Sequence, residues 1–188
     1  MGTGKIGQIL CNIMIGFGVK LICYDVFQSE DVKKAGGVYV SQDEIYAQSD
    51  VIFLMMPLLP ATKHTINDSV LPKLKKGVII INTSRGGLVN TKSVLKGLQS
   101  GVISGVGIDV YENEADYFFQ DWSAKHIEDP DLLALLGEPG VVMTAHQAFF
   151  TKEAVDKICS TTMENLMNFK KGQTGYSHPN NCIPADKN

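Results

Sequence analysis

Four side chains with acid, base or cationic chemistry follow apolar runs of the sequence: Arg85, Glu112, Glu114 and His146. Ligands of an open α/β sheet bind beyond the carboxyl ends of its strands, so we expect these positions to converge on one crevice. An arginine fork suits a carboxylate, and a protonated histidine can donate to a carbonyl oxygen. Together with a hydride donor, these groups would suit the reduction of a 2-oxo acid.

Several alternatives stay open at this point. An acidic neighbour would favour the protonated form of His146 and orient its ring, and spacing alone allows either Glu112 or Glu114 in that role. Arg85 could be a surface arginine beside a Gly-Gly turn. A lone histidine after a strand is more often a satisfied structural residue, and we assign that role to His64, His126 and His178. No histidine pair has metal-ligand spacing such as H-E-x-x-H, so we expect no metal.

A glycine-rich loop opens the chain. Its residues fit the pattern G-x-G-x-x-G directly before a helical pattern, and they are Gly2, Thr3, Gly4, Lys5, Ile6 and Gly7. Such a loop lets the backbone and the helix N-terminus approach a pyrophosphate. Asp25 ends the next apolar run, where a carboxylate can bind the adenosine ribose and would repel a ribose phosphate. The pattern favours NAD over NADP as cofactor, although Asp25 could merely end a strand.

The elements that must position these residues alternate along the chain. Helical patterns cover 6–17, 29–34, 42–48, 68–74, 91–100 and 152–171, and strand patterns cover 19–24, 38–40, 51–55, 78–81, 105–109 and 141–144. Parallel strands need crossovers, which helices supply, so we expect a doubly wound, mostly parallel α/β domain over 1–171. The polar segment 172–188 is interpreted as a tail. Because the glycine fingerprint normally follows a strand, we also expect the first strand of the sheet to be missing.

Composition narrows the classes of partner. A formal net charge of −3 offers no basic face for nucleic acid or an anionic membrane. The apolar stretch 51–59 is interrupted by Pro57 and is too short to span a bilayer. The N-terminus lacks the features of a signal peptide, which favours the cytoplasm. The four scattered cysteines, Cys11, Cys23, Cys159 and Cys182, are interpreted as reduced and mostly buried thiols.

Three segments resemble the signatures of the D-2-hydroxyacid dehydrogenases. They are Asn82-Thr83-Ser84-Arg85-Gly86-Gly87-Leu88-Val89, Gly107-Ile108-Asp109-Val110-Tyr111-Glu112-Asn113-Glu114 and Thr144-Ala145-His146-Gln147-Ala148-Phe149. Their order and spacing match that family. His146-Gln147-Ala148-Phe149-Phe150-Thr151 is similar to the fermentative D-lactate dehydrogenases in particular. The similarity extends from Gly2 to about Pro184.

The resemblance implies a Rossmann-like NAD-binding domain and assigns roles to single residues. The implied catalytic residues are Arg85, which binds the substrate carboxylate, Glu114, which is the acidic partner, and His146, which is the general acid. The implied cofactor contacts beyond the glycine loop and Asp25 are Met56, Pro57 and Thr62 near the adenosine, Thr83 and Ser84, and Asp109 near the nicotinamide. Phe149 would form an apolar wall for the substrate side chain.

The family's subunit also has a substrate domain, which this sequence does not encode, and members are typically homodimers. The resemblance therefore implies a D-lactate/pyruvate or related oxidoreductase for the whole protein, with little or no activity from this chain alone. The preferred 2-hydroxy acid stays open because the missing domain supplies part of the pocket. Two other hypotheses remain: an NAD(H)-sensing, partner-binding module related to dehydrogenase-like corepressors, and a fragment that cannot fold.

Overall fold

The computed structural model describes residues 1–172. Contacts divide the chain into two compact units, the first from Met1 to His146 and the second from Gln147 onward. The boundary between the two units falls inside 1–171, the range that we expected to form one domain. The expected tail, 172–188, lies outside the described residues except for Gly172. Each unit is described by itself.

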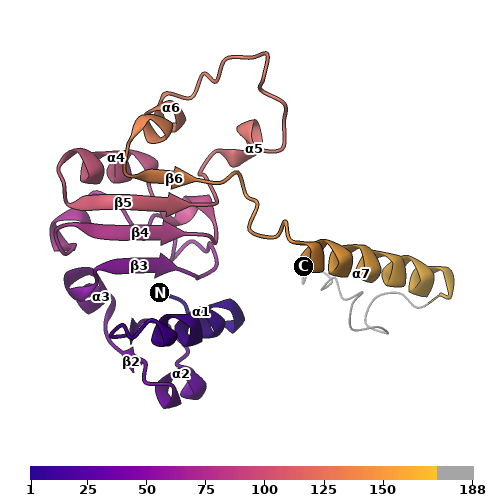
Figure 1. Ribbon diagram of the computed structural model, residues 1–188, viewed down its shortest axis with the longest axis horizontal. Coiled ribbons are helices and arrows are strands. Elements are labelled where there is room, and N and C mark those ends of the chain that lie inside the picture. Colours follow the sequence, from indigo (N-terminus) through magenta and orange to yellow (C-terminus); the bar gives the residue numbers. More distant parts are fainter. Residues whose placement is uncertain (173–188) are drawn as a thin grey trace. The chain divides into compact units, whose positions relative to one another are not determined.

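The strands of the first unit form two parallel sheets, and the larger sheet lies at its centre (Figure 1). Four of them lie side by side in the order β3 (Val51–Leu54), β4 (Val78–Asn82), β5 (Ile103–Ile108) and β6 (Val141–Met143). Leu54 aligns with Asn82 and Asn82 with Ile108, so these strands end at one edge of the sheet. The other two, β1 (Ile22–Cys23) and β2 (Val38–Tyr39), form a separate two-stranded sheet.

Helices connect the strands of the first unit. They are α1 (Lys5–Gly16), α2 (Glu30–Lys34), α3 (Gln42–Gln48), α4 (Thr91–Gln99), α5 (Glu114–Tyr117) and α6 (Pro130–Gly137), with 3-10 turns η1 (Leu71–Lys73) and η2 (Gly86–Leu88). Local sequence explains several helix starts. Ser41 and Glu44 form a reciprocal capping box at α3, and the Asn90 side chain accepts from the Ser93 N–H at α4. The second unit contains α7 (Lys152–Lys170), capped by Thr151.

The core lies on β3, β4 and β5 and the segments packed against them. Its most deeply buried side chains include Ile52, Leu54, Ile66, Val78, Ile80, Leu88 and Ile103. Burial alternates along β4, where Val78, Ile80 and Asn82 are buried and Ile79 is exposed. The period of two places one face of this strand against the core.

The expected α/β class with a mostly parallel sheet is confirmed, and two local expectations are corrected. The helix expected over 68–74 is only the short turn η1, because Pro72 has no N–H to donate within a helix. The strand expected over 19–24 shortens to β1. Helices α5 and α6 were not expected from the sequence.

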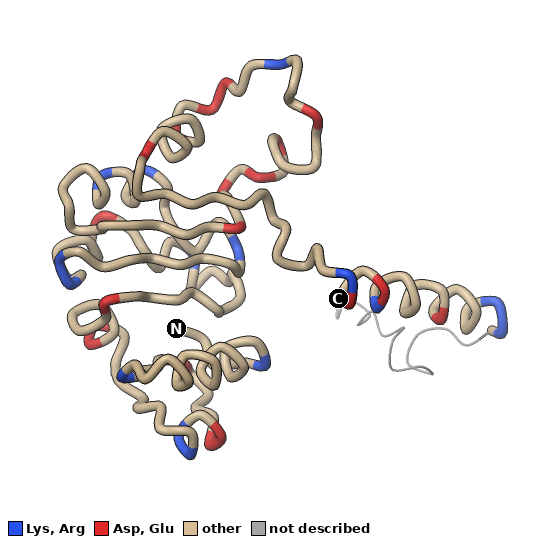
Figure 2. The backbone as a smooth tube through the Cα atoms, in the orientation of Figure 1, with Lys and Arg blue, Asp and Glu red and all other residues tan. Residues whose placement is uncertain are grey.

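Charged side chains of both signs are spread along the chain (Figure 2), except that the stretch 109–138 carries nine acidic residues and only one lysine, Lys125. Within residues 1–172, no helix has the length and apolarity needed to cross a bilayer. The same residues contain no group of three or more His, Cys, Asp and Glu side chains suited to a metal ion. Cys11 and Cys23 are buried free thiols and Cys159 is an exposed one, whereas Cys182 lies outside the described residues.

Candidate active site

His146 and Glu114 meet beyond the carboxyl ends of β5 and β6. The Nδ1 atom of His146 lies 2.9 Å from Oε1 of Glu114, and both side chains are partly buried. The second carboxylate oxygen, Oε2, accepts from the Tyr111 N–H at 3.0 Å. The carboxylate is thus fixed by its own loop and faces one nitrogen of the imidazole.

The backbone of His146 is held by the end of β5. Its N–H donates to the carbonyl oxygen of Asp109 at 2.6 Å, and the Thr144 N–H donates to Ile108. The buried Asp109 side chain accepts from the Thr144 hydroxyl at 2.5 Å. His146 adopts a φ of 51°, a left-handed conformation that is uncommon outside glycine. These bonds compensate the strain and set the direction of the ring.

Phe119 is a neighbour of the histidine that the sequence did not reveal. Its ring centroid lies 5.8 Å from that of His146, and it too has a positive φ, of 64°. The phenyl ring is largely exposed and borders one side of the imidazole. No motif marks this position, because the segment after α5 has no periodicity.

Arg85 lies on a turn packed against the loop that carries Glu114. A Cβ added at Gly86 would lie 2.1 Å from the Tyr111 carbonyl group and 2.6 Å from the Glu112 nitrogen. Only glycine allows the two backbones to come this close. The Arg85 guanidinium is exposed and donates to the Ser84 carbonyl oxygen at 2.7 Å. Among the described residues, no hydrogen bond or ion pair joins Arg85 to Glu114 or His146.

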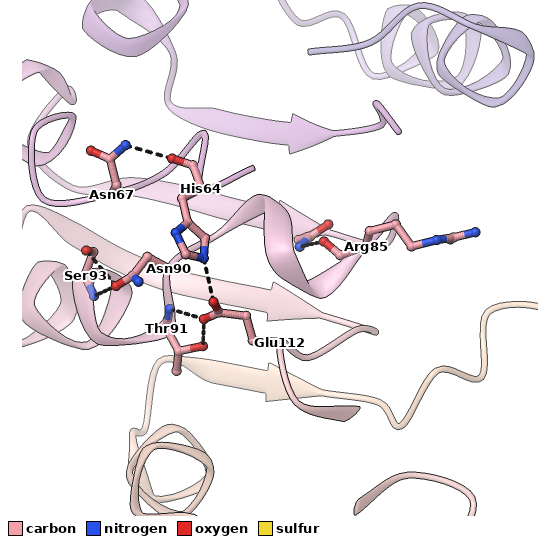
Figure 3. Close-up of polar contacts among 8 residues, drawn as sticks. His64, Asn67, Arg85, Asn90, Thr91, Ser93 and Glu112 are labelled. Atoms are coloured by element: carbon pink, nitrogen blue, oxygen red, sulfur yellow. Dashed lines mark hydrogen bonds and ion pairs between the residues drawn. The ribbon is translucent and has the colours of Figure 1, made fainter. Parts of the chain in front are cut away.

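Glu112, the rival acid, has partners of its own (Figure 3). Its Oε1 lies 2.6 Å from Nε2 of His64, and its Oε2 accepts from the backbone N–H and the hydroxyl of Thr91 at 2.9 and 2.8 Å. Burial raises the pKa of this carboxyl, but the bonds from Thr91 and His64 outweigh burial and hold the pKa below its ordinary value. His64 therefore has the structural partner expected of it.

The same network fixes the Arg85 turn to the loop after β3. The His64 N–H donates to the Gly87 carbonyl oxygen at 2.8 Å. Glu112 meanwhile caps the first turn of α4, next to the Asn90 cap. Three loops, which follow β3, β4 and β5, are therefore joined by the His64–Glu112–Thr91 contacts. No local pattern predicts this cap, because Glu112 comes from the end of a different strand.

The expected cofactor-lining residues after β3 and β4 lie against each other. The Ser84 hydroxyl donates to the carbonyl oxygen of buried Met56 at 2.7 Å, and exposed Thr83 contacts the Met55 sulfur. The Thr62 hydroxyl donates to the Pro57 carbonyl oxygen at 2.6 Å and closes the turn after β3. The loop after β3 and the loop after β4 therefore form one continuous rim, from Met55 to Thr62 and at Thr83 and Ser84, beyond the ends of these strands.

The glycine loop is built around two close approaches. A Cβ at Gly7 would lie 2.2 Å from the Gly2 carbonyl oxygen, and one at Gly2 would lie 2.6 Å from the Met55 backbone. Gly2 also has a φ of 90°. A Cβ at Gly4, by contrast, would meet open space. The first and last glycines are thus required by packing, and the middle one leaves room in front of the helix.

The geometry of this loop fits a dinucleotide. Helix α1 starts with no side-chain cap at Gly4 and no acidic residue in its first turn, so its amides are available to an anion. Asp25 accepts from the Thr3 N–H at 2.5 Å and from the Phe27 N–H at 3.0 Å. Burial raises the pKa of Asp25, but these hydrogen bonds keep it below its ordinary value. A carboxylate beside the loop suits a ribose hydroxyl.

Comparison with known proteins agrees with the fold and this loop. The model of the D-isomer specific 2-hydroxyacid dehydrogenase NAD binding domain matches residues 1–148. A putative D-lactate dehydrogenase from Dictyostelium discoideum is 46% identical over 180 residues, which cover 95% of this chain and 53% of the relative. The D-lactate dehydrogenase of Lactobacillus delbrueckii subsp. bulgaricus is 43% identical over 173 residues, covering 92% of this chain and 52% of that protein.

Solved structures show the same similarity. The D-lactate dehydrogenase from Aquifex aeolicus, complexed with NAD and lactic acid, has a TM-score of 0.83 at 36% identity and covers 91% of this chain. The match covers 52% of that enzyme. The chain therefore spans about half the length of the relatives it matches.

The fold and the glycine loop define a Rossmann-like NAD-binding domain of the oxidoreductase type. The chain belongs to the D-isomer specific 2-hydroxyacid dehydrogenase family. Its cofactor is NAD, as the resemblance implied. Phe149 lies in the second unit, exposed and 6.1 Å from the Phe150 ring, so its expected place beside the substrate stays a prediction.

Proposed function

We propose that this chain supplies the NAD-binding half and the catalytic histidine of an enzyme that interconverts pyruvate and D-lactate. The observation that carries the proposal is the hydrogen bond between His146 Nδ1 and Glu114. Because Nδ1 is engaged, Nε2 on the other side of the ring is the nitrogen that would face the substrate. The names of the D-lactate dehydrogenases at 43 to 46% identity support the choice of substrate.

Each residue has a defined part in this reaction. When bound, NADH supplies the hydride that reaches the carbonyl carbon. His146 gives its Nε2 proton to the carbonyl oxygen, so that the C=O group becomes CH–OH and the imidazole is left neutral. Glu114, through its contact with Nδ1, orients the imidazole. Arg85, whose guanidinium is exposed, pairs with the substrate carboxylate.

The loops at the strand ends would supply the contacts to the cofactor. The glycine loop (Gly2, Gly4, Lys5, Ile6 and Gly7) and Asp25 would hold the pyrophosphate and the adenosine ribose. Met56, Pro57 and Thr62 would line the adenosine, whereas Thr83, Ser84 and Asp109 would lie toward the nicotinamide. We further propose that turnover requires a substrate domain, as the half-length match suggests. From the family resemblance we also propose that the whole protein is a homodimer.

Two measurements test the proposal. NADH binding is followed by fluorescence on the chain itself, and pyruvate-dependent NADH oxidation is followed in a polypeptide that joins this chain to a substrate domain of the family. His146→Gln should lower kcat by about 10²- to 10⁴-fold and leave NADH binding intact. The matched control is His126→Gln, an exposed histidine outside the site, which should leave kcat unchanged.

Two outcomes would contradict the proposal. Undiminished turnover in His146→Gln would show that His146 is not the general acid. NADH binding without any pyruvate-dependent oxidation, even in the joined polypeptide, would instead favour an NAD(H)-sensing module.

A further inference from the structure

A tyrosine that has no part in the cofactor contacts described above lies close to Asp25. Tyr39 is the last residue of β2, and it aligns with Cys23, the last residue of β1. Aligned residues of two parallel strands direct their side chains to the same face of the sheet. On this face the Tyr39 hydroxyl meets the side chain of Thr3, which belongs to the glycine loop and also bonds to Asp25.

Four residues form a continuous hydrogen-bond chain at this place. The Ser29 N–H donates to the Tyr39 hydroxyl oxygen at 2.8 Å. The hydroxyl oxygens of Tyr39 and Thr3 are 2.7 Å apart. The Thr3 hydroxyl donates to Oδ2 of Asp25 at 3.2 Å, and the Thr3 N–H donates to the same oxygen at 2.5 Å. Because Thr3 is buried, its hydroxyl depends on these two protein partners.

The two ends of this hydrogen-bond chain fix the direction of donation. An N–H group can only donate, so the Tyr39 hydroxyl accepts from Ser29 and has its own proton for Thr3. At the other end, burial raises the pKa of Asp25, but hydrogen bonds from Thr3 and from the backbone just after Asp25 hold it below its ordinary value. The ionised carboxylate can only accept. Thr3 therefore accepts from Tyr39 and donates to Asp25, and each bond polarises the next.

The ring of Tyr39 is anchored by packing as well as by its hydroxyl. It lies against the small buried cluster of Cys11, Cys23 and Val32, and the Nζ atom of Lys33 is 5.8 Å from the ring centroid. Phenylalanine would keep both of these contacts. Replacing Tyr39 with phenylalanine should therefore remove the hydroxyl and leave the fold in place.

We propose that Tyr39 is a positioning residue for the cofactor, which acts through the Thr3 hydroxyl to hold Asp25 where its carboxylate accepts the 2′-hydroxyl of the adenosine ribose. The inference rests on the proposed contact between Asp25 and this ribose. Without the Tyr39 hydroxyl, the Thr3 hydroxyl loses its donor and the Ser29 N–H loses its acceptor. The Thr3 side chain can then rotate, and its bond to the carboxylate weakens.

The test compares two ligands that differ only in the ribose hydroxyl. NADH and the NADH analogue that contains 2′-deoxyadenosine are titrated against the full polypeptide, and binding is followed by fluorescence. The wild type should bind the analogue about tenfold more weakly, because a hydrogen bond to a charged group is lost. Tyr39→Phe should weaken NADH binding about fivefold and leave the affinity for the analogue unchanged, so that the ratio of the two Kd values falls to about twofold. A purely structural tyrosine would weaken both ligands equally and preserve the ratio.

Two further variants test the route from Tyr39 to the ribose. Tyr24→Phe removes the hydroxyl of a tyrosine that directly precedes Asp25 and has no place in the hydrogen-bond chain, and it should leave both affinities unchanged. Thr3→Val interrupts the hydrogen-bond chain at its middle. In the Thr3→Val background, Tyr39→Phe should not change the ratio any further, because the two hydroxyls act in series. Folding of each variant is checked by thermal unfolding.

The outcomes separate this inference from the proposal on which it rests. Equal affinities of the wild type for NADH and the analogue, or no binding of either, would contradict the contact between Asp25 and the ribose and with it the role of Tyr39. A wild-type ratio near ten that stays the same in Tyr39→Phe would overturn the role of Tyr39 alone. A further fall of the ratio in the double variant would exclude Thr3 as the connecting residue.

Discussion

The contact at Gly86 gives the sharpest prediction. An added Cβ would lie 2.1 Å from the Tyr111 carbonyl group, whereas ordinary van der Waals contact begins at 3.4 Å, so the two loops must separate by more than an ångström. The obstacle is backbone and cannot rotate away. Gly86→Ala should therefore lower the free energy of unfolding by about 3 kcal/mol, the upper part of the range for overpacking. In urea this corresponds to a midpoint shift of roughly 1.5 M.

Gly87→Ala is the matched control. A Cβ there would meet only the Leu58 side chain, at 3.0 Å, and Leu58 is exposed and able to turn aside. Its effect should stay below about 1 kcal/mol, because the neighbour yields at little cost. Both variants are measured by urea unfolding of the full chain, followed by circular dichroism. Equal midpoints for the two variants would refute the idea that the Arg85 turn is fixed by backbone contact with the Glu114 loop.

Three other perturbations follow from the site. Glu112→Ala should cost about 2 to 3 kcal/mol in urea unfolding, because Thr91 and His64 lose a charged hydrogen-bond partner; a loss near zero would contradict this. Gly7→Ala should weaken NADH binding in a fluorescence titration and lower the melting temperature, whereas Gly4→Ala should leave the melting temperature nearly unchanged. For Asp25, whose folded pKa lies below its ordinary value, the stability advantage over Asp25→Asn should be complete above about pH 5 and decline as the pH falls toward the folded pKa. A pH-independent difference in melting temperature would count against that last prediction.

The sequence predicted those parts of the fold that local patterns determine. The glycine loop, its helix and Asp25 came from spacing, and the structure joins Asp25 to Thr3 directly. Apolar runs placed β3 to β6 because buried parallel strands read as continuous apolar segments. Helix α6 also has a local start signal in the sequence, an Asp129 cap followed by Pro130 at the first helical position.

Local sequence patterns could not predict the contacts between loops that lie far apart in the chain. Spacing could not choose between Glu112 and Glu114, because both follow the same strand; the resemblance favoured Glu114, and the structure pairs it with His146. The ring contact of Phe119 depends on a left-handed residue in an irregular segment. The separation of β1 and β2 from the sheet of β3 to β6 depends on which strands pair with one another. Strand pairing is set by tertiary structure, and the propensities of single residues do not determine it.

The attachment of His146 to the end of β5 decouples the acid–imidazole pair from the part of the chain between α5 and α6 that lies beyond Phe119, whose ring contacts the imidazole. The chain leaves after Tyr117 and returns through Pro130, yet both members of the acid–imidazole pair are anchored to Tyr111 and Asp109 on the same strand end. Insertions or deletions within 121–128 alter the closure entropy only slightly. Such a layout allows this surface segment to differ in length among relatives while His146 and Glu114 keep their places.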